Sequence, residues 1–256
     1  MPTPRTSVIL TLFGVFCAPI ALRAQTVSDP SKTKTLAITD QNASVLNRLK
    51  DYPNLEVLSI ECLESLQALP DDIGTLVKLR ELNINNGDGC SMNPKLPESI
   101  GNLRALEKLN LYGAQDPRPV GEHYGPQPTS YHEFPKSMSQ LKALTYLELG
   151  RNGFEEVPSF VQNLPHLKEL GFAWNKNVKK LPPFLASLPE LQTLRLDSDG
   201  LTDLPDFLNQ SPKLSLITLG DNCEITAKAT RKKDLIRRFP RIKFDFEGEY
   251  DCSPEK

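Results

Sequence analysis

The sequence has little of what nucleotide-dependent enzymes and nucleic-acid-coating proteins rely on. Its 256 residues include 30 Lys and Arg against 32 Asp and Glu, so the formal net charge is −2. That balance argues against a protein that coats nucleic acid, because phosphate binding is driven by clustered Lys and Arg. The chain contains no GxxxxGK motif followed by Ser or Thr and no GxGxxG motif. It therefore has neither of these phosphate-binding signatures.

Histidine is scarce, with only three residues. His123 and His132 lie beside Glu122 and Glu133, but their spacing matches no established metal-ligand motif. No Ser-His-Asp or Cys-His set can be assembled from residues in adjacent positions. We therefore expect no catalytic residues, no metal and no cofactor. A metal-dependent enzyme that uses this His-containing insertion is the minor alternative.

The apolar run from Val8 to Ile20 is too short to span a bilayer, which takes about 20 residues. It follows Arg5 and leads to small residues around Ala24, as is typical of a secretory signal peptide. We expect residues 1–24 to be this signal, with an uncleaved N-terminal anchor as the alternative. The expected location is secreted, periplasmic or at the cell surface, with no membrane span after cleavage.

Cysteines are also few, and their number suggests disulfides. Five are present, and four remain once Cys17 leaves with the signal peptide. An even number of cysteines in an exported protein indicates disulfide bonding. Neighbouring positions suggest the pairs Cys62–Cys90 and Cys223–Cys252. Four reduced thiols are the alternative.

What the sequence has in abundance is a repeating pattern of leucines. Blocks of the form LxxLxL recur about every 23 residues, with two insertions. Within a block, apolar residues alternate with polar ones, as in a strand with one buried face. One unit cannot bury its leucines alone, so neighbouring units must bury them. The first leucines of the blocks are Leu55, Leu79, Leu106, Leu144, Leu167, Leu191 and Leu214.

The second half of each unit carries an aliphatic–Pro pair, as in LPDDIGTLVKL and LPESIGNLRAL. With these motifs, the chain resembles the leucine-rich repeat family over roughly residues 33–246. The resemblance implies an α/β solenoid, a leucine-rich repeat horseshoe with a parallel concave sheet. We expect about seven repeats at 55–226, with an insertion at about 115–133. An N-terminal cap at 25–54 and a C-terminal cap at 227–256 would close the ends.

Position nine of such repeats favours Asn, whose amide can bond the turning backbone of the next coil. Asn152, Asn175 and Asn222 fit this pattern. The positions that depart from it are Leu63, Gly87, Ala114 and Asp199. We therefore expect an irregular asparagine ladder that is poorest in the N-terminal half.

The two caps have their own patterns. The N-terminal cap reads as a strand at 36–38 and a helix at about 43–50, and the C-terminal cap as a helix at about 230–238 and a strand around 242–246. In the C-terminal helix we expect Leu235, Ile236 and Phe239 to face the last repeat. The basic residues would then lie in water, and an acidic partner or a membrane surface is the alternative. These are Arg231, Lys232, Arg237 and Arg238.

The strands of the expected concave sheet would expose positions two, three, five, seven and eight of each block. Aromatic residues and Arg are the usual carriers of binding energy on such a surface. The long insertion can hang over the rim of the sheet, and long ordered loops are often functional. The candidate partner-binding residues are Tyr112, Tyr146, Glu148, Arg151, Trp174, Arg195 and Asp197 on the sheet, with Tyr124 and Tyr131 in the insertion.

These features predict a non-catalytic binding module with a protein partner and no nucleic-acid partner. The alternatives are a glycan-binding protein and an enzyme inhibitor. At the level of the residues, the alternative is that the rings pack on one another and that the insertion is merely tolerated.

Overall fold

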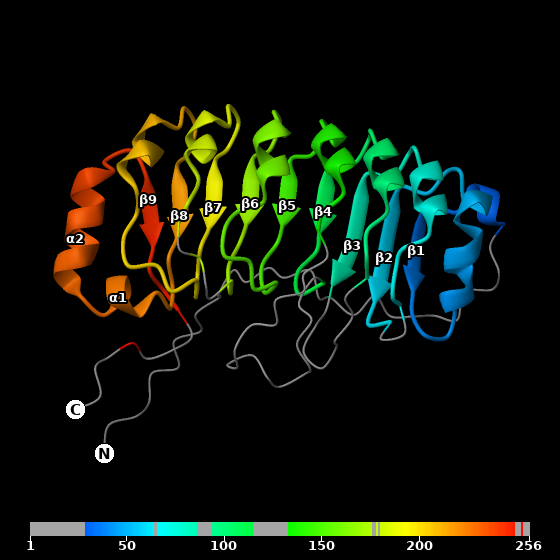
Figure 1. Ribbon diagram of the computed structural model, residues 1–256, viewed down its shortest axis with the longest axis horizontal. Coiled ribbons are helices and arrows are strands. Elements are labelled where there is room, and N and C mark those ends of the chain that lie inside the picture. Colours follow the sequence, from blue (N-terminus) through cyan, green and yellow to red (C-terminus); the bar gives the residue numbers. More distant parts are fainter. Residues whose placement is uncertain are drawn as a thin grey trace, which may run out of the picture.

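A computed structural model describes residues 29–63, 66–85, 94–114, 133–175, 178, 180–248 and 252. The expected signal peptide lies outside them. The described chain forms one open sheet of nine parallel strands, which follow one another in chain order (Figure 1). The strands are β1 Thr35–Ile38, β2 Val57–Glu61, β3 Glu81–Asn85, β4 Lys108–Asn110, β5 Tyr146–Glu148, β6 Glu169–Gly171, β7 Thr193–Arg195, β8 Leu216–Thr218 and β9 Lys243–Asp245. This is the leucine-rich repeat solenoid that the sequence predicts, and β1 and β9 are the strands expected in the two caps.

The fourth position of each block forms a continuous apolar column through the sheet. Strand pairing places Leu58 opposite Leu82, Leu82 opposite Leu109, and Leu109 opposite Leu147. The column continues in the same register to Phe244 in β9. Every leucine in it from β2 to β7 is fully buried. The prediction that neighbouring units bury these leucines is therefore confirmed, and each coil shields the interior of its neighbours.

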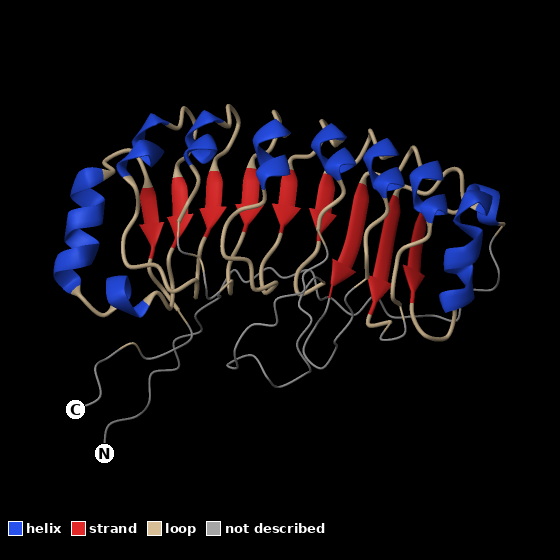
Figure 2. Cartoon of the chain, in the orientation of Figure 1, coloured by secondary structure: helices blue, strands red, loops and turns tan. Residues whose placement is uncertain are grey.

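Short 3-10 helices form a second row beside the strands (Figure 2). Their bounds are η1 Pro30–Lys32, η2 Ala43–Asp51, η3 Asp71–Thr75, η4 Glu98–Asn102, η5 Lys136–Gln140, η6 Ser159–Asn163, η7 Pro183–Ser187 and η8 Asp206–Gln210. From η3 to η8, each helix is five residues long and is preceded by a proline. Proline fixes its own φ and has no N–H, so it suits the residue that opens a helix.

The predicted cap helices form, and two residues of the C-terminal one differ from expectation: Ile236 is exposed, and Arg238 is only 22% exposed rather than lying in water. The helix α1 spans Cys223–Thr226, and α2 spans Ala229–Arg238. Leu235 and Phe239 are buried as predicted, but Ile236 is 55% exposed. The prediction for Ile236 was wrong because the helix turns this side chain away from the last repeat. Among the described residues, no helix combines the length and the apolar character needed to cross a membrane.

The asparagine ladder is present in the C-terminal half. Asn152, Asn175 and Asn222 are fully buried, and their amides donate to backbone carbonyls of their own and the preceding repeat. Asp199 takes the same position, and its Oδ1 accepts the N–H of Asn175 at 2.7 Å. Asp199 therefore keeps the accepting part of the ladder, while its Oδ2 has no hydrogen-bond partner among the described residues, so the ladder is irregular at this position as expected. At the N-terminal end, buried Leu63 replaces the amide with an apolar contact.

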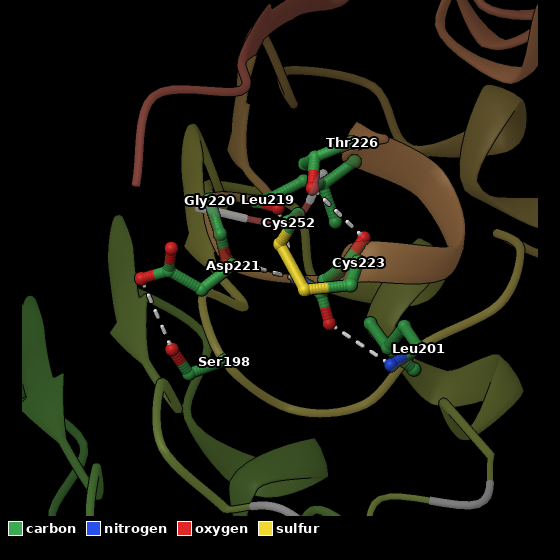
Figure 3. Close-up of a disulfide and its surroundings, with 9 residues drawn as sticks. Ser198, Leu201, Leu219, Gly220, Asp221, Cys223, Thr226 and Cys252 are labelled. Atoms are coloured by element: carbon green, nitrogen blue, oxygen red, sulfur yellow. Dashed lines mark hydrogen bonds between the residues drawn. A yellow bond between two sulfur atoms is a disulfide. The ribbon is translucent and has the colours of Figure 1, made fainter. Parts of the chain in front are cut away.

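The C-terminal end of the chain is tied to the solenoid by a disulfide between Cys223 and Cys252, with a Cα–Cα distance of 5.0 Å (Figure 3). The backbone at Glu247 lies so close to the last turn that a Cβ at Gly220 would overlap its carbonyl. Cys62 is also disulfide-bonded. Cys90, its expected partner, lies outside the described residues.

Candidate functional site

The register of three strands places Glu148, Gly171 and Arg195 in one row across the sheet. Glu148 in β5 pairs with Gly171 in β6, which pairs with Arg195 in β7. All three occupy position five of their block, between the buried apolar residues at positions four and six. Because successive side chains of a strand point to opposite faces, the row lies on the face away from the core.

Glu148 lies sideways over the neighbouring strand and is only 8% exposed. Its Oε1 accepts the N–H of Gly150 at 2.7 Å. Gly171 makes this possible, since a Cβ there would overlap the Glu148 carboxylate. Burial raises the pKa of Glu148, while the Gly150 N–H and Arg195 act against that rise. The sequence placed Glu148 among the exposed positions, and the missing side chain at Gly171 explains why it is buried.

Arg195 joins the carboxylates of two strands. Its Nη2 is ion-paired with Oε1 of Glu169, and its Nη1 lies 3.6 Å from Oε2 of Glu148. The guanidinium carbon is also 6.0 Å from the centre of the Tyr146 ring, within the range of a cation–π contact. Tyr146, Glu148, Glu169 and Arg195 therefore form one group, called here the concave cluster. With both carboxylates ionised, the concave cluster carries one excess negative charge.

Tyr146 supplies the aromatic part of the concave cluster. Its hydroxyl lies 3.5 Å from Oε2 of Glu148, the outer limit of a hydrogen bond. Burial raises the pKa of Tyr146, and the charge of Glu148 raises it further. The ring is half-buried, so one part packs on the sheet while another remains accessible. A ring held in this way loses little conformational freedom when a partner binds.

Tyr112 extends the site by one repeat. It follows β4, and its backbone N–H donates to Oδ1 of Asn110 at 3.0 Å. A Cβ at Gly150 would lie 3.0 Å from Cδ2 of Tyr112, so the ring rests against this glycine. Gly150 also bonds to Glu148. One backbone position therefore connects Tyr112 with the concave cluster.

Arg151 and Trp174 occupy a different part of the repeat. Both have left-handed backbones, with φ of 56° and 67°. They belong to a column at position eight that is left-handed in every repeat where the structure describes this position: Cys62, Gly113, Arg151, Trp174, Ser198 and Asp221. The column turns the chain from the strand into the asparagine ladder. Trp174 is half-buried there rather than exposed as predicted.

Asp197 lies in the same repeat as Arg195, two residues further along the chain. Its carboxylate accepts the N–H of Gly220 at 2.7 Å and the hydroxyl of Thr218. Burial raises the pKa of Asp197, and those two hydrogen bonds act against it. Asp197 therefore forms its hydrogen bonds with residues nearer the C-terminal end of the sheet. The residues of the concave cluster instead interact with one another across β5, β6 and β7.

The structure thus brings together Tyr112, Tyr146, Glu148 and Arg195 from the predicted set. Tyr124 and Tyr131 lie outside the described residues, as do His123 and His132. Within the described part of the chain, no three His, Cys, Asp or Glu side chains are grouped so that they could hold a metal ion. Glu169 and Gly171 were missing from the candidate set. The sequence feature that could have indicated them is Gly171 itself, because it occupies the position at which the two neighbouring blocks carry Glu148 and Arg195.

Comparison with protein-family models yields no match. Among curated proteins, the chain is 31% identical over 202 residues to TMV resistance protein N of Nicotiana glutinosa, covering 76% of this chain and 16% of that protein. It is 28% identical over 188 residues to Disease susceptibility protein LOV1 of Arabidopsis thaliana, covering 66% of this chain and 20% of that protein. The chain therefore spans a fifth or less of these relatives.

Solved structures similar to this chain include a leucine-rich repeat protein of Leptospira interrogans. Its TM-score is 0.49 at 23% identity, over 87% of this chain and 64% of that one. An internalin of Listeria monocytogenes has a TM-score of 0.46 at 15% identity, over 80% of this chain and 58% of that one. What places this chain in the leucine-rich repeat fold is its own nine-strand register together with the repeated LxxLxL blocks.

Proposed function

We propose that this leucine-rich repeat chain is an exported, non-catalytic module that binds a protein partner on its concave face. The partner would contact the concave cluster and Tyr112. The observation that carries the proposal is the convergence of Tyr146 and Glu148 from β5 and of Arg195 from β7 onto one patch.

The composition of this patch suits protein recognition. Tyr and Arg are enriched among the residues that dominate binding energy at protein interfaces. Both are held by the sheet here, and Arg195 is already oriented by Glu148 and Glu169. A preorganised patch loses less conformational entropy on binding, which favours affinity.

The test is affinity capture from the native compartment, followed by identification of the bound protein and measurement of its dissociation constant. We expect Tyr112→Ala combined with Tyr146→Ala to weaken binding at least about 30-fold, because loss of one interface hot spot costs about 2 kcal/mol or more. Lys142→Ala combined with His166→Ala is the matched control, because both residues are exposed and lie outside the sheet. Both variants must retain the circular dichroism spectrum of the parent.

Equal affinity of the aromatic variant and the parent would contradict the placement on the concave face. Capture of glycans on an array, with no captured protein, would favour the glycan-binding alternative instead.

A further inference from the structure

The C-terminal cap concentrates positive charge in a chain that is otherwise acidic. Residues 228–243 contain eight Lys and Arg and one Asp, a net charge of +7. The whole chain carries −2, so the remaining residues together carry −9. A separation of this size produces a strong local field at one end of the solenoid.

Part of this positive charge is neutralised inside the cap. Lys228 is 2.6 Å from Glu224, and Arg238 is ion-paired with Asp203 and Asp206. Arg237 contacts Asp234 at 2.7 Å, but its side chain remains 79% exposed. Water weakens an ion pair of that kind.

Three cations of α2 differ from these in their surroundings. In the part of the chain that the structure describes, no carboxylate lies within ion-pair distance of Arg231, Lys232 or Lys233. Arg231 and Lys233 are exposed, and Lys232 lies at the flank of α2, 5.4 Å from the centre of the Phe246 ring.

The geometry of α2 turns several of these residues outward together. Leu235 and Phe239 pack against the solenoid, which fixes the inner side of the helix. Lys233, Ile236 and Arg237 are spaced i, i+3 and i+4, so they lie on one outer face. Ile236 is one of two large hydrophobic side chains exposed in the described residues. The outer surface made by Lys233, Ile236 and Arg237 is called here the cap face, and Arg231 and Lys232 lie at its two flanks.

We propose that the cap face docks on the surface of an anionic bilayer. Clustered Lys and Arg are attracted to anionic headgroups, and each one near the surface raises the partition coefficient roughly fivefold. The exposed Ile236 side chain can enter the boundary between headgroups and acyl chains. This surface is separate from the concave cluster, so the two proposals stand independently.

The position of α2 favours a planar partner over an extended polyanion. The helix lies at the very end of the solenoid (Figure 1), so a flat surface can reach it without approaching the acidic remainder. A long nucleic acid or polysaccharide would extend over repeats that carry the opposing negative charge. The cap face also contains no aromatic residue of the kind that anchors protein interfaces.

The test is co-sedimentation of the full chain with two kinds of vesicle: phosphatidylcholine alone, and phosphatidylcholine mixed with phosphatidylglycerol. We expect binding to the anionic vesicles only, and loss of that binding at high salt because of screening. Lys233→Gln combined with Arg237→Gln should lower the partition coefficient about 30-fold. The matched control, Lys136→Gln combined with Lys142→Gln, removes the same charge from exposed positions near η5 and should bind as the parent does.

Ile236→Ser should weaken binding while leaving its salt dependence unchanged. This variant therefore distinguishes the contribution of side-chain insertion from that of charge attraction. Unchanged unfolding midpoints for all variants exclude loss of fold as the cause. The proposal is overturned if the two vesicle types bind equally or not at all, or if the cap-face and control variants behave alike. Binding to heparin without binding to anionic vesicles would also overturn it.

Discussion

At the scale of single residues, Asp199 stands out because a carboxyl group occupies a position that its neighbours fill with an amide. It is fully buried, and its Oδ2 has no hydrogen-bond partner among the described residues. The equivalent amides of Asn175 and Asn222 donate to backbone carbonyls. An ionised carboxylate cannot donate, but a protonated one can. Burial raises the pKa of Asp199 well above its usual value, and nearby Asp197 and Glu148 add to that effect.

Replacing this carboxyl with an amide should therefore stabilise the fold. We expect Asp199→Asn to raise the free energy of unfolding at neutral pH by about 1–3 kcal/mol, because the amide satisfies the buried position without having to be protonated. Urea denaturation followed by circular dichroism measures the change.

The stabilisation by Asp199→Asn should increase as the pH rises. The pKa of Asp199 is raised in the native protein above the ordinary value of 3.8 that it takes in the unfolded chain. The protonated carboxyl therefore contributes its full stability below pH 3.8, and this contribution is lost as the pH rises through the raised native pKa. The difference between Asp199→Asn and the parent should therefore widen as the pH rises from 3.8 toward the raised native pKa, and stay constant above it. A difference that stays constant or shrinks below that pKa would show that Asp199 is not protonated in the native protein.

At the scale of elements, Arg238 fastens α2 to the last turn of the solenoid. Its guanidinium reaches Asp203 at 2.7 Å, Asp206 at 2.8 Å and the carbonyl of Leu204 at 2.7 Å. The side chain is 22% exposed, so the prediction that Arg238 lies in water was wrong. Arg238 instead connects two elements that the burial of Leu235 and Phe239 brings together.

Removing this connection should loosen the cap. We expect Arg238→Ala to lower the free energy of unfolding by about 2 kcal/mol, because it removes the several hydrogen bonds of a largely buried guanidinium, including the one to the Leu204 carbonyl. Arg237→Ala is the control from the same helix, since Arg237 makes a single exposed ion pair and its loss should cost about 0.5 kcal/mol or less. Equal effects of the two variants in thermal and chemical denaturation would argue that Arg238 does not hold the cap.

At the scale of the whole molecule, stability depends on an uninterrupted stack with protected ends. A solenoid is stabilised by contacts between neighbouring coils, so an end coil has fewer contacts than an internal one. Here the column that begins at Leu36 ends at Phe244, which is partly exposed. The Cys223–Cys252 disulfide joins positions 29 residues apart and holds the segment that follows β9.

Opening this disulfide should weaken the C-terminal end and the protein as a whole. We expect Cys223→Ser combined with Cys252→Ser to lower the free energy of unfolding by roughly 3–4 kcal/mol, from the chain entropy of the closed loop. Chemical denaturation under non-reducing conditions, followed by the fluorescence of Trp174, compares the variant with the parent. If the two unfold at the same denaturant concentration, the disulfide contributes nothing to stability.

The sequence by itself determined the repeat, the strands, the buried leucine column and the cap helices, because these depend on the spacing of apolar residues along one coil. It also indicated Tyr146 and Arg195 as members of one patch, since position in the block gives the face of the sheet. Only the tertiary structure decided that Glu148 is buried, that Asp199 takes a ladder position and that Ile236 faces outward. Each of these outcomes depends on an adjoining part of the fold. Gly171 leaves space for the Glu148 carboxylate, Asn175 donates to Asp199, and packing against the last repeat sets the rotation of α2.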